Sequence, residues 1–238
     1  MNFPMRLMTR SALAAMLFAL ALPAFAQAPA PRAGTDYTAL PAPIPLYGPP
    51  GKIEVAEVFS YHCGTCAVFE PPMAEWKKRQ PADVRVSYVH AAFGGAIDNL
   101  GRGFFAAEAL GASDRTHAGM FKAFHVDRSI RQGTIDEVAD AYAAQGLERA
   151  NVLRTMNSFG VTSRLNRARQ FAQRAGVSGT PTVIVNGRYR VNWTPERGAD
   201  GVLRTIDVLV ARERARLRAE ATAAAPRAAA AAAARATR

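Results

Sequence analysis

Two cysteines, Cys63 and Cys66, are the residues of this chain whose type and spacing most clearly indicate chemistry. They are the only cysteines in the 238-residue sequence, and two residues separate them. A thiolate is a nucleophile and two neighbouring thiols can close a disulfide, so such a pair can exchange electrons with other thiols. The spacing supports an attacked cysteine, Cys63, and a more shielded resolving cysteine, Cys66, about one turn further along.

The elements on either side would place this pair at a junction between a strand and a helix. An apolar run over Ile53–Tyr61 predicts a strand, and the segment from Cys63 to Arg79 predicts a helix that Pro71 should kink. Unpaired N–H groups and a partial positive charge at a helix N-terminus make a cysteine more acidic. Lowering the Cys63 pKa by about two units would favour the reduced form by roughly 2.7 kcal/mol. A stabilised dithiol implies a disulfide that tends to accept electrons.

Two other uses of the cysteine pair are disfavoured. A structural disulfide would close a ring of four residues, which removes little entropy from the unfolded chain. A zinc site would need two further ligands, and the sequence has no second Cys-x-x-Cys motif. The histidines follow no ligand spacing: His62, His90, His117 and His125. We therefore expect no metal, and no cofactor beyond the redox-active disulfide.

Four residues near the cysteines are predicted to tune their chemistry: Glu57, His62, Gly64 and Thr65. Glu57 interrupts an apolar strand, either as a solvent-facing residue or as a half-buried carboxylate beneath the cysteines. In the second arrangement it could shift the thiolate pKa or relay protons. His62 stands out by its position beside Cys63, whereas the other histidines are expected to be surface or packed residues.

A second motif, Gly179-Thr180-Pro181-Thr182, precedes a predicted hairpin. Two β-rich runs within residues 182–191 flank an Asn-Gly pair, which is a strong hairpin signal. X-Pro bonds are the usual place of cis peptides, so a cis Thr180–Pro181 bond is expected. The backbone of Thr180 would be exposed there to pair with an extended peptide. Thr180 and Pro181 are therefore candidate substrate-binding residues.

The other elements follow in an order typical of an α/β fold. Val84–His90 alternates as a second strand, which predicts a strand–helix–strand unit with a parallel pair. A long helical region comes next, with expected helices over 96–110, 116–124 (capped by Ser113 or Asp114), 134–146 (opened by a capping box at Thr134), 148–158 and 163–175. A last helix is expected over 200–219.

Both ends of the chain differ in composition from the expected domain over 51–219. Residues 1–26 have the pattern of a secretory signal peptide, which predicts export to the periplasm, where disulfides persist. Residues 27–50 form a Pro/Ala-rich leader, flexible at first and then extended along the domain. The Ala/Arg-rich tail over 220–238 is expected to be disordered, although its alanines would also suit a longer helix. The net charge of +11 is spread over the chain, so no nucleic-acid partner is expected.

Five separated elements resemble the DsbA-like thiol:disulfide interchange proteins of the thioredoxin superfamily. They are Glu57–Tyr61 with Cys63-x-x-Cys66, Phe69-Glu70-Pro71, Gly94-Gly95, Gly179-Thr180-Pro181 and Val185–Tyr189. The likeness covers about residues 35–217. It implies an α/β, thioredoxin-like fold with an inserted all-helical subdomain at about 93–175. It also implies that Cys63 is the exposed nucleophile, Cys66 its buried partner, Pro181 a cis-proline facing the disulfide and Glu57 a buried acid below it.

Two departures from the best-known members concern the redox chemistry. Gly64-Thr65 lies between the cysteines where those members carry Pro-His, and a threonine hydroxyl offers a weaker hydrogen bond than a histidine. We therefore expect a less oxidising couple than that of the strongest members. Thr180 precedes the proline where those members carry valine, and disulfide isomerases of the superfamily often carry threonine there.

The leading hypothesis is a periplasmic oxidase that introduces disulfides into unfolded or folding exported proteins with free thiols. The resemblance implies reoxidation by a DsbB-type, quinone-linked membrane partner. The alternatives are a disulfide isomerase or reductase of the same fold, or a peptide-binding chaperone whose cysteine pair is not essential. Such isomerases usually carry an N-terminal dimerisation domain, and the roughly 25 residues between the signal and the first strand are too few for one. A monomer is therefore expected.

Overall fold

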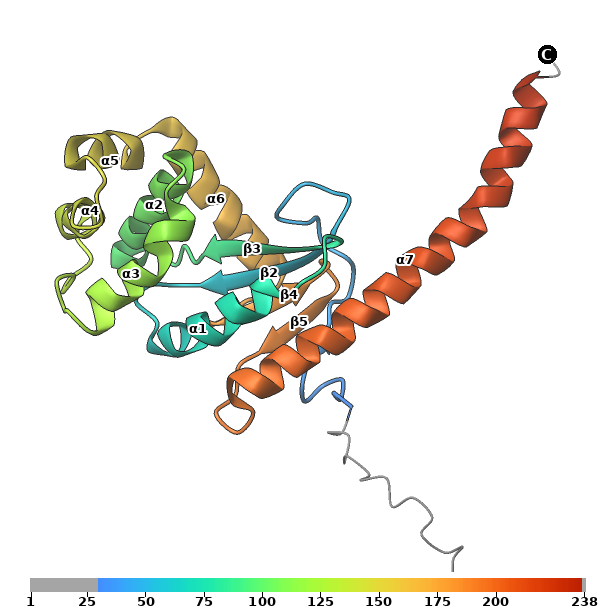
Figure 1. Ribbon diagram of the computed structural model, residues 1–238, viewed down its shortest axis with the longest axis horizontal. Coiled ribbons are helices and arrows are strands. Elements are labelled where there is room, and N and C mark those ends of the chain that lie inside the picture. The colour runs from blue at the N-terminus through green and yellow to red at the C-terminus, as the bar shows by residue number, and fades with distance from the viewer. Residues whose placement is uncertain (1–29, 237–238) are drawn as a thin grey trace, which may run out of the picture.

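The computed structural model describes residues 30–236, in which a mixed sheet carries helices on both faces (Figure 1). The sheet has five strands in the order β1-β5-β4-β2-β3. The strands are β1 (Thr38–Ala39), β2 (Ile53–Phe59), β3 (Val84–His90), β4 (Thr182–Val185) and β5 (Tyr189–Asn192). The predicted signal peptide lies outside the described residues. Within residues 30–236, no helix combines the length and the apolar character needed to cross a bilayer.

Strand β2 lies inside the sheet and leads to the cysteines. It pairs in parallel with β3 and antiparallel with β4, and all of its residues are buried. Burial on both faces explains why its sequence is apolar on both sides of the sheet, apart from Glu54 and Glu57. Helix α1 (Gly64–Lys78) connects β2 to β3, as the predicted strand–helix–strand unit requires. The Asn-Gly turn between β4 and β5 has positive φ at Asn186 and Gly187, and the predicted hairpin is confirmed.

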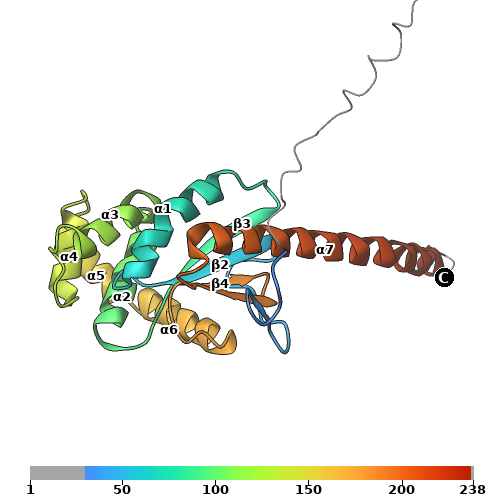
Figure 2. The same cartoon turned by 90° about the horizontal axis from the view of Figure 1, so that it is seen from below.

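Helices cover both faces of the sheet. Helix α1 and the last helix, α7 (Gly198–Ala236), lie on one face, and helix α6 (Phe159–Arg174) lies on the other (Figure 2). The core between the sheet and α1 and α7 includes Val55, Met73, Trp76 and Ile206, all buried. A second core joins the other face of the sheet to the helices inserted between β3 and β4.

The insert consists of five helices that extend to one side of the sheet (Figure 1). They are α2 (Gly95–Ala109), α3 (Ser113–His125), α4 (Ile135–Ala143), α5 (Arg149–Met156) and α6. The capping box at Thr134 is confirmed, since its side chain accepts the Glu137 N–H while the Glu137 carboxylate accepts the Thr134 N–H. The cap predicted for α3 is wrong: the helix already begins at Ser113, and the residue before it, Ala112, has no side chain that could cap it.

The leader belongs to the fold from its second half onward. Thr38 and Ala39 pair with β5 as an edge strand. Further along, the backbone N–H groups of Tyr47 and Gly48 both donate to the buried carboxylate of Glu54 at 2.6 Å. The folded unit therefore begins before residue 51, because the leader supplies backbone groups that the sheet edge and Glu54 bind.

The expectation of a disordered tail differs from the structure, in which α7 continues to Ala236. Alanine has the highest helix propensity, and the tail extends a helix that is already packed, so no new nucleation is needed. The side chains over 217–226 are all exposed, so this stretch of α7 projects beyond the domain (Figure 1).

Candidate active site

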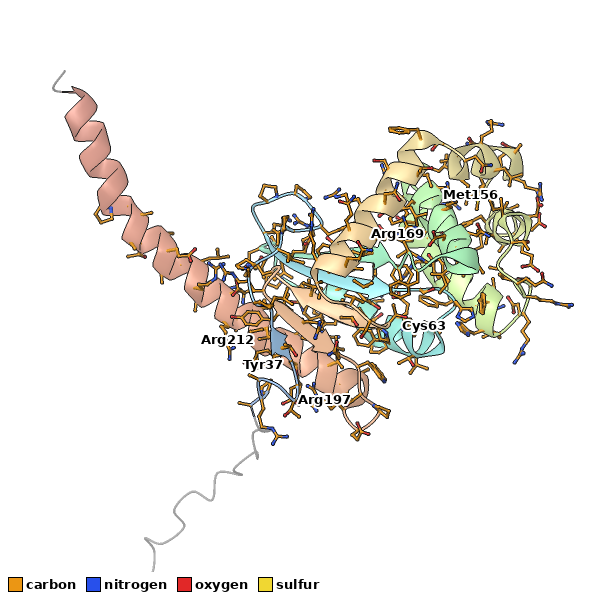
Figure 3. The ribbon with its side chains drawn as sticks, turned by 180° about the vertical axis from the view of Figure 1, so that it is seen from behind. Tyr37, Cys63, Met156, Arg169, Arg197 and Arg212 are labelled. Carbon is orange, nitrogen blue, oxygen red and sulfur yellow. The ribbon has the colours of Figure 1, made fainter. Side chains whose placement is uncertain are left out.

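Cys63 caps the N-terminus of helix α1. Its backbone is extended, with φ −83° and ψ 113°, and its sulfur accepts the Cys66 N–H at 3.1 Å. Both thiols are free; Cys63 is half-buried and Cys66 is completely buried. Figure 3 shows Cys63 at the end of α1 that meets the insert. The chain leaves β2, turns over Ser60–His62 and enters α1, so a central strand and a helix N-terminus together position the sulfur.

The two thiols are driven to opposite protonation states. The pKa of Cys63 falls to about 6, chiefly because the Cys66 thiol can donate a hydrogen bond to its sulfur. The backbone N–H groups of Cys66 and Thr65 lower it further, and partial burial opposes them. Burial raises the pKa of Cys66 far above its ordinary value, and the neighbouring Cys63 raises it further. The arrangement therefore favours a thiolate at Cys63 and a thiol at Cys66.

The distant Thr180–Pro181 loop contacts the first cysteine. The peptide bond between these residues is cis, which confirms the prediction from the sequence. The Cys63 thiol lies 3.2 Å from the Thr180 carbonyl oxygen, to which it can donate. Pro181 is buried and Thr180 is half-buried. The Thr182 hydroxyl donates to the Gly179 carbonyl at 2.7 Å and closes the loop on itself.

Glu57 is buried inside the sheet, with 1% of its surface exposed. It lies in β2 beside Tyr88 of β3 and Val183 of β4. The solvent-facing interpretation is therefore wrong, and the burial is complete rather than half. Burial raises the pKa of Glu57 well above its usual range, and the charges of Glu70 and Cys63 raise it further. Its Oε2 atom has no hydrogen-bond partner among the described residues.

A buried polar chain near Glu57 was not predicted from the sequence. The Tyr61 hydroxyl lies 2.9 Å from Nδ1 of His117, and Nε2 of His117 lies 3.2 Å from the Glu70 carboxylate. With the proton on Nε2, the histidine donates to Glu70 and accepts from Tyr61. His117 comes from helix α3, far along the chain from both partners. The position of His117 in the sequence does not indicate these contacts, because they arise only when α3 packs against α1.

Two further histidines hold the peptide groups of Tyr61. The Tyr61 N–H donates to Nε2 of His90 at 3.3 Å, and Nδ1 of His90 donates to the Ala91 carbonyl at 2.8 Å. Burial lowers the pKa of His90 to about 3, so this ring stays neutral. On the other side, Nε2 of His125 donates to the Tyr61 carbonyl at 2.9 Å. The turn before Cys63 is thus fixed from β3 and from α3.

The remaining predicted tuning residues occupy three different environments. His62 is exposed, and its ring packs edge-on against Phe124 at 5.2 Å between centroids. Gly64 is exposed in the first turn of α1. Thr65 is half-buried and its backbone N–H faces the Cys63 sulfur. Their influence on the redox couple stays a prediction.

Apolar side chains are exposed on three segments that belong to or follow the elements of the site. Val68 on α1, Phe93 after β3 and Val126 after α3 expose 65%, 50% and 70% of their surfaces. Phe93 also lines a cavity of about 370 Å³ with Arg169, Gln173 and Val177, and Val177 lies three residues before Thr180.

In the part of the chain that the structure describes, no three His, Cys, Asp or Glu side chains gather as a metal site would require.

Comparison with known proteins places this arrangement in a family. The profile of a family described as Thioredoxin matches residues 48–207. The thiol:disulfide interchange protein DsbA of Pseudomonas aeruginosa is 36% identical over 201 residues, which cover 84% of this chain and 92% of that protein. DsbA of Azotobacter vinelandii is 36% identical over 200 residues, with the same shares covered.

Solved structures agree with these sequence matches. The crystal structure of the oxidoreductase DsbA from Xylella fastidiosa superposes with a TM-score of 0.73 at 40% identity, covering 78% of this chain and 98% of that one. Pseudomonas aeruginosa DsbA superposes with a TM-score of 0.72 at 35% identity and covers 77% and 94%. The thioredoxin-like fold with its helical insert is thereby confirmed. The chain belongs to the DsbA family of thiol:disulfide oxidoreductases.

Proposed function

We propose that this protein introduces disulfide bonds into exported proteins in the periplasm. The observation that carries the proposal is the contrast between the two sulfurs, since an acidic, half-buried Cys63 lies at a helix N-terminus and Cys66 is buried behind it. A thiolate stabilised in the reduced state makes the disulfide the less stable form, which therefore tends to accept electrons. The names of its relatives, thiol:disulfide interchange protein, support the same chemistry.

The reaction proceeds in two exchange steps. A substrate thiolate attacks the Cys63 sulfur of the disulfide, forms a mixed disulfide and expels Cys66, which takes up a proton. A second substrate thiolate attacks the substrate sulfur of that intermediate, closes the product disulfide and releases Cys63 as a thiolate. Two electrons pass to the protein, and the low pKa of Cys63 makes it a good leaving group. Glu57, buried beneath the pair with a raised pKa, supplies the proton that Cys66 takes up.

The surface around Cys63 and Thr180 also indicates how substrate and redox partner bind. An extended client segment pairs with the backbone of Thr180, whose carbonyl already reaches Cys63 at 3.2 Å. The exposed Val68 and Phe93 contact apolar residues of unfolded clients. The cysteine pair is itself the redox group, so the reaction uses no cofactor. A quinone-linked membrane protein of the DsbB type takes the two electrons back, and the protein acts as a monomer.

An isomerase or reductase is the second candidate, and two features favour it. Thr180 precedes the cis-proline, and Gly64-Thr65 places no histidine between the cysteines. Gly64-Thr65 favours a less oxidising couple, and threonine before the proline is common in disulfide isomerases of the superfamily. The two functions differ in the redox state in which the enzyme works, since an isomerase needs Cys63 as a thiolate and an oxidase needs the disulfide.

The equilibrium reduction potential against glutathione separates these candidates. A potential well above that of thioredoxin, about −270 mV, supports the oxidase. It should be accompanied by stoichiometric oxidation of a reduced, unfolded protein, and C63S should abolish that activity. A potential close to that of thioredoxin, with efficient rearrangement of scrambled disulfides, would reject the oxidase in favour of the isomerase. Refolding activity that survives loss of both cysteines would indicate a chaperone.

A further inference from the structure

A histidine of the helical insert lies against the cysteine motif. His125 is the last residue of helix α3, and its Nε2 atom is 2.9 Å from the Tyr61 carbonyl, two residues before Cys63. A carbonyl oxygen only accepts hydrogen bonds, so Nε2 carries the hydrogen of this contact. The redox motif itself offers no histidine between its cysteines.

The same ring also approaches the residue that follows Cys63. A Cβ atom built on Gly64 would lie 4.0 Å from Cε1 of His125, which is ordinary van der Waals distance. The imidazole therefore contacts the chain before Cys63, at the Tyr61 carbonyl, and lies close to Gly64 on the other side. Two aromatic rings of the insert hold it there: Phe121 stacks on it at 6.4 Å with an interplanar angle of 24°, and Phe124 lies at 5.1 Å.

His125 and Cys63 lie at opposite kinds of helix end. His125 ends a helix, and the partial negative charge of a helix C-terminus stabilises a cation there. The Cys63 thiolate lies at the opposite kind of helix end, the N-terminus of α1. A positive charge near a thiolate favours the thiolate over the thiol.

We propose that His125 is a redox-tuning residue that stabilises the Cys63 thiolate from the helical insert. The proposal rests on the proposed thiol–disulfide function and deepens it. The redox couple then depends on the docking of α3 against the β2–α1 turn, because that contact brings the ring to Tyr61 and Gly64. His125 acts through the reduced state of Cys63 and makes no bond to the substrate.

The test compares three variants in the full-length protein. His125→Ala removes the ring, and His125→Gln keeps an N–H donor for the Tyr61 carbonyl but cannot become charged. Lys122→Ala is the matched control, because Lys122 is a basic residue in the same last turn of α3 that is exposed and paired with Asp127 instead. The measurements are the equilibrium constant with glutathione and the pH midpoint of the Cys63 thiolate absorbance.

His125→Ala and His125→Gln should each make the protein about tenfold less oxidising against glutathione, which corresponds to roughly 30 mV for a two-electron couple. The thiolate midpoint should rise by about one pH unit, and Lys122→Ala should match the unmodified protein. The proposal would be overturned if the equilibrium constants with glutathione of both histidine variants lay within twofold of that of the unmodified protein. Full recovery in His125→Gln would also overturn it, because the donor N–H alone would then suffice.

Two controls separate an effect on the redox couple from unfolding and from failure of the proposed oxidase function. Far-UV circular dichroism of each variant establishes that the total helix content is unchanged, and His125→Gln is the variant to use if His125→Ala unfolds. The comparison is a difference between variants, so it can be made even if the unmodified protein has a thioredoxin-like potential. In that case the proposed oxidase function is rejected. The role of His125 is still tested by the change in the equilibrium constant and in the thiolate midpoint between its variants and the unmodified protein.

Discussion

At the scale of single residues, the distinct behaviour of Cys63 and Cys66 comes from burial and hydrogen-bond donors. Cys63 receives hydrogen bonds from the Cys66 thiol and from first-turn amides, whereas Cys66 has no exposed surface. Hydrogen bonds to a charged acceptor are stronger than bonds between neutral groups. The Cys66 thiol is thus the main cause of the lowered pKa of Cys63.

Replacing Cys66 tests this dependence. Cys66→Ala removes the donor, and we expect the pKa of Cys63 to rise from about 6 by one to two units, since a hydrogen bond to a charged group contributes about 1.5–3 kcal/mol. Cys66→Ser keeps a donor, so its shift should be smaller. The rate of alkylation by iodoacetamide between pH 4 and 10 measures both midpoints. Equal midpoints in the two variants would contradict the dependence.

Glu57→Gln separates the role of the buried carboxyl from its effect on stability. A folded-state pKa raised above the unfolded value means that Glu57 destabilises the protein as pH rises through the unfolded pKa of about 4.3. The stability of the glutamine variant relative to the unmodified protein should therefore increase from pH 4 to pH 7. Urea unfolding at both pH values measures this difference, and a difference independent of pH would exclude a raised pKa.

The same variant should slow the exchange step in which Cys66 changes protonation. General acid–base groups contribute about 10²–10⁴-fold to such steps, and water can replace part of the effect, so we expect a loss of about tenfold or more at pH 7. Stopped-flow Trp fluorescence during reaction with a dithiol measures this rate. An unchanged rate would show that Cys66 exchanges its proton by another route.

Residue types alone identified the parts of the site that lie close in sequence or carry distinctive chemistry. The Cys-x-x-Cys pair and the cis bond at Pro181 were both predicted, and the burial of Glu57 was one of two alternatives. His117 and His125 were not singled out. Both come from helix α3, and their contacts with Tyr61 depend on how the insert packs on the sheet, which no local pattern encodes.

At the scale of elements, periodicity located the strands and most helices because each buries one clear face or runs wholly through the core. Strand β3 matches its predicted bounds, and α1 begins one residue after the expected start because Cys63 caps it. Strand β1 was missed, since two exposed residues in a Pro/Ala-rich segment carry no alternation. The extension of α7 was the less favoured of two alternatives, because its composition suits both a helix and a disordered tail.

Removing the end of α7 should have little effect on the domain. The last completely buried side chain of the helix is Glu213, and the side chains over 217–226 are exposed. Changes at exposed positions usually alter the free energy of unfolding by no more than about 0.5 kcal/mol. A chain that ends at Ala219 should therefore melt within about 2 °C of the full-length protein. The reduction potential should also be unchanged, because the site lies at α1 and the cis-proline loop.

A core substitution in the same helix provides the contrast. Leu209 has no exposed surface and packs in the core with Trp76 and Val185. Leu209→Ala should cost about 2–5 kcal/mol, mostly through loss of buried apolar contacts. Thermal and urea unfolding measure both changes. A large loss on truncation would show that residues 220–238 contribute to the fold.

At the scale of the whole molecule, one core joins the thioredoxin part to the insert. Phe59 at the end of β2 packs against Phe104 of α2 and His117 of α3, with ring centroids 5.2 Å and 4.9 Å apart. The continuous cluster around it includes buried residues of the sheet and of helices α2 to α6. Because the same cluster lies beside the cysteine motif, we expect the redox state of the cysteines to be linked to the stability of the entire domain.

The reduced protein should therefore gain stability over the oxidised protein as pH rises. The Cys63 pKa is lower in the folded state, about 6, than its ordinary value of 9.0, so its contribution is present at high pH and is lost as pH falls through 6. Cys63 is only half-buried, and solvent screening reduces the effect to about 1–2 kcal/mol between pH 5 and pH 8. The oxidised protein has no thiol to titrate and provides the reference.

Urea unfolding of both redox forms at pH 5, 6, 7 and 8 measures this linkage. Trp76 and Trp193 report on the thioredoxin part by fluorescence, and far-UV circular dichroism reports mainly on the helices, most of which belong to the insert. Both probes should give the same midpoint at each pH, because the shared core makes unfolding cooperative. Separate midpoints would show that the insert unfolds on its own. A difference between redox forms that does not grow with pH would contradict a Cys63 thiolate stabilised by folding.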